Sequence, residues 1–114
     1  MHLVIEKNGI DSLHIVAFTH RNLSVNDIGK LHIEECSQQA RLSLLKDKMI
    51  LKELMFLSTC NRVEFVMVTE TTVDIEFLNS FFHELYPSFN EAETDLFSSK
   101  GNVYHGKNAV EHLL

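Results

Sequence analysis

Apolar and polar residues follow one another along the chain with two different periods, and these periods predict strands and helices. Short runs of bulky apolar residues predict strands at 12–18, 54–57, 63–69 and, more briefly, 102–105. Apolar residues three and four positions apart predict two amphipathic helices. The first follows a Ser24 N-cap and runs to about Lys46, and the second covers 75–85 and ends before Pro87. A short helical turn is expected at 90–96, and a further helix with Asn108 as its N-cap begins near the last residues.

The phase of the first helix predicts which of its side chains lie in the core. Ile33, Cys36, Ala40 and Leu44 are spaced by three, four and four residues, so they share one face of a helix. We therefore expect Cys36 to be a core residue rather than a reactive thiol.

The predicted order of elements is strand, helix, strand, strand, helix, strand. This order is typical of the ferredoxin-like split β-α-β sandwich, an α+β fold with helices on one face of an antiparallel sheet. The 114 residues suit one domain. Because the last predicted helix ends in Leu113 and Leu114 and has nothing after it to cover its apolar face, we expect a C-terminally truncated single domain, 1–114, of a longer protein.

Composition and charge indicate the cellular compartment of the protein and the kinds of partner that it disfavours. No apolar run reaches the roughly 18 residues of a membrane span, residues 1–7 lack the pattern of a signal peptide, and two cysteines without metal-ligand spacing fit a reducing cytoplasm. A disulfide between Cys36 and Cys60 is the less favoured alternative. The net charge of -6 by itself disfavours a nucleic-acid-binding module. Since no Gly-rich phosphate loop and no metal-binding motif occurs, we expect no cofactor-binding residues and no metal ligands in these residues.

The segment STCNRV at 58–63 carries the strongest chemical signal in the sequence. It places Cys60 among small polar residues between two predicted strands, with Arg62 two residues on. A cysteine attacks as a thiolate, and a nearby cation favours that form. The alternative for Cys60 is an ordinary core cysteine, which does not need polar neighbours.

Arg62 and its neighbours are candidates for substrate binding. A guanidinium can hold a carboxylate through two parallel hydrogen bonds, and on an extended chain Arg62 points to the same side as Cys60. The alternative for Arg62 is a solvated surface arginine. Thr59 and Asn61 either donate hydrogen bonds to the same ligand or only shape the turn. Of the histidines, His20 follows the first strand and His112 lies on the last helix, and either one can orient a substrate or transfer protons.

The run LSTCNRVE at 57–64 closely resembles the active-site motif of the glutamyl-tRNA reductase family. Three weaker matches stand in the same order as in that family: AFTHR at 17–21, YHG at 104–106 and AVEHLL at 109–114. Together the resemblance covers about residues 13–114, which corresponds to the N-terminal catalytic domain of the family.

The resemblance implies an activity and roles for these residues. Members of the family reduce glutamyl-tRNA to glutamate-1-semialdehyde with NADPH through a cysteine thioester, the first step of tetrapyrrole synthesis. By this resemblance Cys60 is the nucleophile, Thr59, Asn61 and Arg62 bind the glutamyl group, and His112 is important for activity. Glutamyl-tRNA is then the substrate. NADPH and a homodimer contact belong to domains absent from this chain, and channelling to the next enzyme of the pathway is a further expectation.

Two departures from the family pattern limit these expectations. The proline that follows the first-strand turn is missing at 23–25, and later family segments lie beyond Leu114, so we expect the fragment alone not to complete the reduction. Two alternatives stay open. One is a thiol acyl-transferase or hydrolase that uses Cys60 without reduction, and the other is a ferredoxin-like ligand-binding domain without catalysis.

Overall fold

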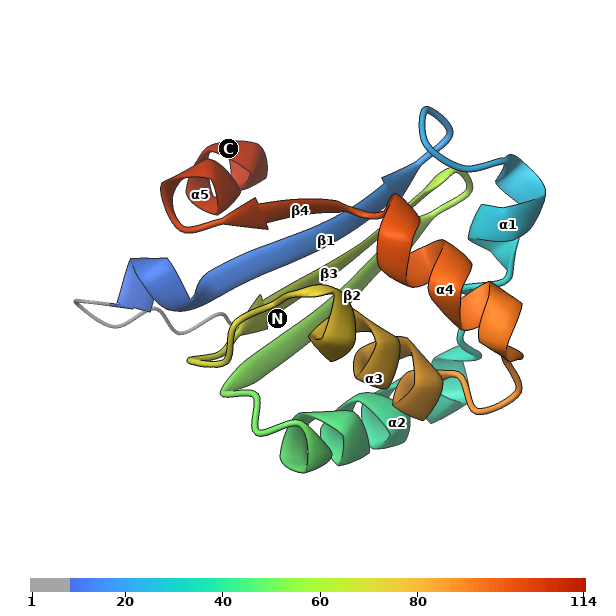
Figure 1. Ribbon diagram of the computed structural model, residues 1–114, viewed down its shortest axis with the longest axis horizontal. Coiled ribbons are helices and arrows are strands. Elements are labelled where there is room, and N and C mark those ends of the chain that lie inside the picture. The colour runs from blue at the N-terminus through green and yellow to red at the C-terminus, as the bar shows by residue number, and fades with distance from the viewer. Residues whose placement is uncertain (1–8) are drawn as a thin grey trace.

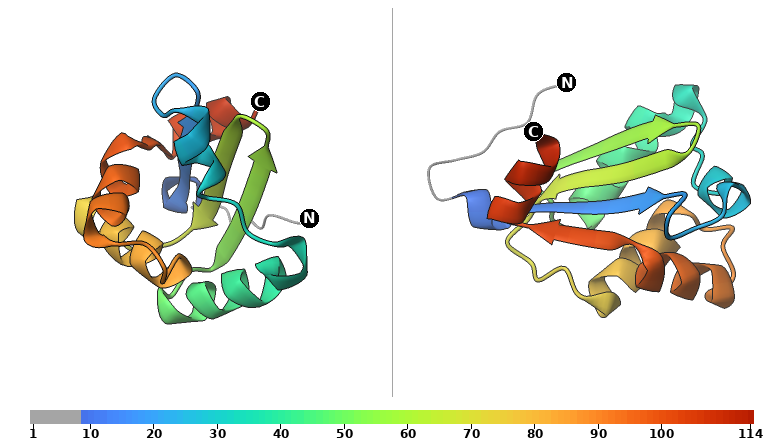
Figure 2. Two further views of the ribbon diagram at one scale, coloured as in Figure 1. Left: turned by 90° about the vertical axis from the view of Figure 1, so that its right-hand side faces the viewer. Right: turned by 90° about the horizontal axis from the view of Figure 1, so that it is seen from above.

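A four-stranded antiparallel sheet forms the centre of the computed structural model, which describes residues 9–114 (Figure 1). The strands are β1 (Leu13–Thr19), β2 (Glu53–Thr59), β3 (Arg62–Val68) and β4 (Asn102–His105). They lie in the order β2-β3-β1-β4, and each neighbouring pair is antiparallel, as can be followed in Figure 2. The predicted α+β ferredoxin-like class is confirmed. Residues 1–7, where the sequence predicts no signal peptide, lie outside the described residues.

Helices cover both faces of this sheet and not one face as predicted, because the last helix packs Ala109 on the face opposite the other helices. The helices are a 3-10 turn η1 (Gly9–Ser12), α1 (Val25–Gly29), α2 (Glu35–Lys48), α3 (Ile75–Leu85), α4 (Glu91–Lys100) and α5 (Lys107–Leu113). Figure 1 shows α2, α3 and α4 on one side of the sheet and α5 on the other. Within residues 9–114 no helix is both long and apolar enough to span a bilayer.

The alternation of side chains along β1 divides the core into two layers. Val16 and Phe18 face α2–α4 and join the larger apolar cluster, whereas Ile15 and Ala17 face α5 and pack with Ala109. All but the last residue of β1 are buried, because the strand has helices above and below it. Five fully buried phenylalanines fill the larger layer, and each contributes about 1.5–3 kcal/mol on burial: Phe18, Phe65, Phe81, Phe82 and Phe97.

The prediction of one long helix from Ser24 to Lys46 is wrong, because the segment 30–34 separates α1 from α2. In this segment Leu31 and Ile33 are 0% and 1% exposed while the residues between and beside them face solvent. Burial at every second position is the pattern of extended chain and not of a helix. The segment therefore runs along the surface between two helices and places Leu31 and Ile33 in the core.

The predicted core face of the first helix is also wrong. Cys36, Ala40 and Leu44 are exposed, and Leu44 keeps 70% of its surface accessible. The face that packs inward instead includes Leu45, with Leu42 partly buried beside it. The predicted face was counted from Ile33, which lies in the segment before α2. The spacing from Ile33 therefore does not describe a face of this helix.

The other helices are close to their predicted positions. Helix α3 begins after Asp74, whose carboxylate accepts the backbone N–H of Phe77. The short turn expected at 90–96 is the ten-residue helix α4, which Asn90 caps with Glu93 in a capping box. Asn108 is not the cap of α5, because the helix already begins at Lys107.

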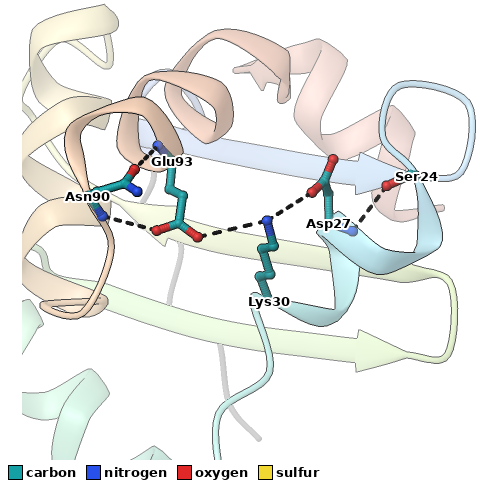
Figure 3. Close-up of polar contacts among 5 residues, drawn as sticks. All are labelled: Ser24, Asp27, Lys30, Asn90 and Glu93. Carbon is teal, nitrogen blue, oxygen red and sulfur yellow. Dashed lines mark hydrogen bonds and ion pairs between the residues drawn. The ribbon is translucent and has the colours of Figure 1, made fainter.

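Polar contacts join α1 to the N-terminal end of α4, as Figure 3 shows. Ser24 caps α1 by accepting the N–H of Asp27. Lys30 then lies 3.3 Å from a carboxylate oxygen of Asp27 and 3.8 Å from one of Glu93. These half-exposed pairs contribute at most about 1 kcal/mol each. They connect the segment after β1 to the helix that leads into β4.

Candidate active site

The register of the sheet brings two predicted site residues, Thr59 and Arg62, into one row with Thr19. Thr19 on β1 lies opposite Arg62 on β3, and Arg62 lies opposite Thr59 on β2. The ends of β1 and β2 and the beginnings of β3 and β4 therefore meet at one end of the sheet. Figure 1 shows the loop after β1 beside the β2–β3 turn there.

A pocket of about 550 Å³ opens at this end, on the face of the sheet that α5 covers in part. It contains five predicted site residues and five that were not predicted. The first group is His20, Thr59, Asn61, Arg62 and His112, and the second is Ala17, Thr19, Arg21, Asn102 and Tyr104. The structure thus brings together residues from four strands, two loops and α5. The role of each remains a prediction.

Cys60 lies at the edge of this pocket and not in its wall. It forms a two-residue turn with Asn61 between the paired Thr59 and Arg62, and both flanking residues Thr59 and Asn61 line the pocket. The thiol is exposed and free, so it is neither a core cysteine nor part of a disulfide with Cys36. The sulfur is therefore accessible from solvent beside the pocket.

Arg62 faces the pocket from the first position of β3. Its side chain is 54% exposed, and its Nη1 lies 3.8 Å from Oε2 of Glu64. At this distance the two groups form an ion pair without a hydrogen bond. The guanidinium donors are thus not held tightly by Glu64, and the fork is suited to a ligand carboxylate.

His112 is held over the sheet by two contacts. Its Nε2 is hydrogen-bonded to Oε1 of Glu64, and its ring stacks on Tyr104 with centroids 4.1 Å apart and an interplanar angle of 18°. The side chains of His112 and Glu64 are only 19% and 12% exposed. Helix α5 packs Ala109 against β1, and this packing places His112 above β3 one turn later.

The loop that carries His20 is held by two hydrogen bonds of the Asn22 side chain. The side-chain oxygen of Asn22 accepts the backbone N–H of Thr19 at 2.8 Å, and its amide donates to the carbonyl of Lys100. The first contact closes the turn after β1, and the second ties it to the chain just before β4. These contacts hold the turn from which His20 and Arg21 line the pocket.

The lining of the pocket is electropositive although the chain as a whole is acidic. Arg21 and Arg62 contribute two permanent positive charges, and no aspartate or glutamate is among the lining residues described. The carboxylate of Glu64 lies nearby but already contacts His112 and Arg62. The pocket is therefore suited to an anionic group, with hydroxyl and amide donors beside the arginines.

Sequence reasoning missed Glu64 and Tyr104 as parts of this site. The alternation of a strand gives a signal for Glu64, since it lies two residues after Arg62 and shares its face of β3. For Tyr104 the signal was weaker, because only the pairing of β4 with β1 brings it beside α5.

Comparisons with known proteins agree in pointing to one family. The family model described as "Glutamyl-tRNAGlu reductase, N-terminal domain" matches residues 16–114. Curated relatives include the glutamyl-tRNA reductases of Aliarcobacter butzleri, 27% identical, and of Macrococcus caseolyticus, 30% identical, each over 100 residues that make up 87% of this chain and 22% of the relative. A solved glutamyl-tRNA reductase from Methanopyrus kandleri superposes with a TM-score of 0.56 at 22% identity over 90% of this chain and 21% of that one, which is a likeness of fold. The chain spans about a fifth of the length of these relatives.

Proposed function

The chain belongs to the family of glutamyl-tRNA reductase N-terminal domains, and from this premise we propose that it binds the glutamyl group of glutamyl-tRNA and supplies the nucleophile. The observation that carries the proposal is the electropositive pocket with an exposed cysteine at its edge. An acidic acyl group on a bulky carrier fits this arrangement, because the acyl group enters the pocket while the carrier stays in solvent.

The proposed chemistry of these residues is the transfer of an acyl group to sulfur. The Cys60 thiolate attacks the carbonyl carbon of the glutamyl ester, a C–S bond forms, and the ester C–O bond breaks. The ribose oxygen of tRNA leaves and takes up a proton. Arg62 binds the side-chain carboxylate of the glutamyl group through two hydrogen bonds, and Thr59 and Asn61 donate hydrogen bonds to the acyl group. His20 orients the substrate from the loop, and His112 transfers protons.

The reducing half of the family reaction needs NADPH, and the residues described here do not fit a site for it. A dinucleotide usually binds where a parallel strand turns through a Gly-rich loop into a helix, whereas every strand pair of this sheet is antiparallel. We therefore propose that NADPH is bound outside these 114 residues, and that they alone form the thioester, or hydrolyse it slowly, without completing reduction.

The proposal extends to the whole protein that carries these residues. It is an NADPH-dependent oxidoreductase of the cytoplasm that makes glutamate-1-semialdehyde for tetrapyrrole synthesis. It forms a homodimer through another domain, and its reactive aldehyde product passes to the next enzyme by channelling.

The proposal is tested by exchanging each of the two cysteines in that whole protein. Cys60→Ser should lower semialdehyde formation from glutamyl-tRNA and NADPH by several orders of magnitude, because removing a nucleophile commonly costs about 10⁴–10⁶-fold. Cys36→Ser is the matched control, since Cys36 is also exposed but lies on α2, away from the pocket. Activity retained in Cys60→Ser would remove the nucleophile assignment.

The products separate the alternatives. Release of free glutamate without any semialdehyde in the presence of NADPH would indicate a thiol hydrolase. A Cys60 that iodoacetamide alkylates no faster than Cys36, without protection by glutamyl-tRNA, would favour a binding domain without catalysis.

A further inference from the structure

We propose that Glu64 is a positioning residue that fixes the tautomer and the orientation of His112. Its consequence for catalysis rests on the proposed function, but the state of the imidazole does not. Glu64 comes from β3 and His112 from α5, 48 positions later, and only the fold brings them together.

The contact determines which ring nitrogen of His112 carries the proton. Oε1 of Glu64 lies against Nε2 of His112. An ionised carboxylate only accepts hydrogen bonds, so the Nε2 of a neutral His112 must be the protonated nitrogen. Its Nδ1 then keeps a lone pair and is the atom that can accept a proton.

The surroundings of Glu64 make this contact persistent. The side chain of Glu64 is 12% exposed, and its backbone pairs with Ala17 of β1 on one side and Leu57 of β2 on the other. A carboxylate withdrawn this far from water needs hydrogen-bonding or charged partners. Its two oxygens find them in His112 on one side and Arg62 on the other. One carboxylate therefore contacts both the proposed proton-transfer group and the proposed carboxylate clamp.

Tyr104 completes the restraint on the ring. The hydrogen bond fixes the direction of Nε2, and the stack on Tyr104 at 4.1 Å fixes the plane of the imidazole. When Nδ1 accepts a proton during the reaction, the nearby carboxylate stabilises the imidazolium that forms. This is the role that the buried aspartate has in serine protease triads.

The tautomer can be measured directly by imidazole ¹H–¹⁵N NMR of the protein, with His112→Gln used to assign the resonance among the seven histidines. The wild type should show His112 as the Nε2–H tautomer. Glu64→Gln should give a mixture or the Nδ1–H form, because an amide can present either its oxygen or its NH₂ to Nε2. Glu70→Gln is the matched control: it removes the same charge from a carboxylate that pairs with Lys52 beyond the end of β3, and it should leave His112 unchanged.

Kinetics of the whole reductase give a second readout. Glu64→Gln should lower kcat by about 10²–10⁴-fold, the range of a general acid–base contribution, without raising KM for glutamyl-tRNA, because Arg62 loses a competing carboxylate. A merely structural role would raise KM or lower the unfolding midpoint and leave the tautomer unchanged.

The results of these measurements test the positioning role of Glu64 separately from the proposed function. A wild-type His112 in the Nδ1–H form, or one unaltered by Glu64→Gln with kcat maintained, would overturn the positioning role. If Glu64→Gln does not fold, the wild-type tautomer still gives the answer. A wild-type protein that makes no semialdehyde would end the proposed function but would not affect the tautomer result.

Discussion

Gly101 is the position where adding a single methyl group should disturb the core most clearly. It lies between α4 and β4 with φ of -68° and ψ of 142°, a backbone conformation that alanine adopts freely. A Cβ placed there would lie 2.8 Å from Cγ1 of Val16 and 2.9 Å from Cζ of Phe18. Both residues are fully buried, so neither can move into solvent.

The size of the effect follows from these two contacts. Carbon atoms pack at about 3.5–4.0 Å, so both side chains must shift by several tenths of an ångström inside a filled layer. Such overpacking costs about 1–3 kcal/mol. The lower entropy of the unfolded chain with alanine returns about 0.4–1 kcal/mol. We expect Gly101→Ala to lower the free energy of unfolding by about 1–2 kcal/mol.

Urea and thermal unfolding followed by circular dichroism measure this loss. For a domain of this size it corresponds to roughly 4–8 °C in Tm. Gly29→Ala is the matched control, because a Cβ at Gly29 in α1 meets nothing within 4 Å. Helix propensity should make that variant more stable by about 0.5–1 kcal/mol. Shifts of the same sign in both variants, or a Gly101→Ala protein as stable as the wild type, would refute the reasoning.

Two further changes test the polar groups of the core. Tyr86→Phe should lower the free energy of unfolding by about 1–3 kcal/mol in urea titrations. The buried Tyr86 hydroxyl donates a hydrogen bond to the carbonyl of Leu31 at 2.6 Å, and this carbonyl would lose its partner. An unchanged urea midpoint would contradict the prediction. Burial lowers the pKa of His14 below its usual value of 6.5. The charge of His105 also lowers this pKa, whereas the hydrogen bond to the backbone carbonyl of Ser12 raises it. The unfolded chain therefore binds more protons below pH 6.5, so unfolding free energy should fall as the pH falls from about 7 to about 5. His14→Gln should flatten this dependence in denaturant titrations, and an equal slope in the variant would exclude His14 as its source.

Local sequence was sufficient to predict the strands and the exposed turn that carries Cys60. Strand periodicity depends on residues next to one another, and so does the turn that exposes Cys60 between Thr59 and Arg62. Their positions were therefore predictable to within one or two residues. The clustering of Arg62 with Thr59 also follows from the pairing of two strands joined by a short turn.

Helix phase and helix partners were less predictable. The first helical segment was read through 30–34, although Leu31 and Ile33 alternate with exposed residues there. Because the helix face was counted from Ile33, Cys36 was predicted to lie in the core, whereas it is exposed. The spacing of apolar residues shows which side chains share a face of a helix, but it does not show at which residue the helix ends.

The sequence by itself determined the α+β order, the exposed turn at Cys60 and the family to which the motif points. Only the tertiary structure decided that α5 covers the opposite face of the sheet, that the pocket is electropositive, and that Glu64 meets His112. The physical reason is the range of the interactions. Strand periods and tight turns arise between near neighbours in the chain, whereas a contact across 48 positions depends on strand order, register and helix docking together.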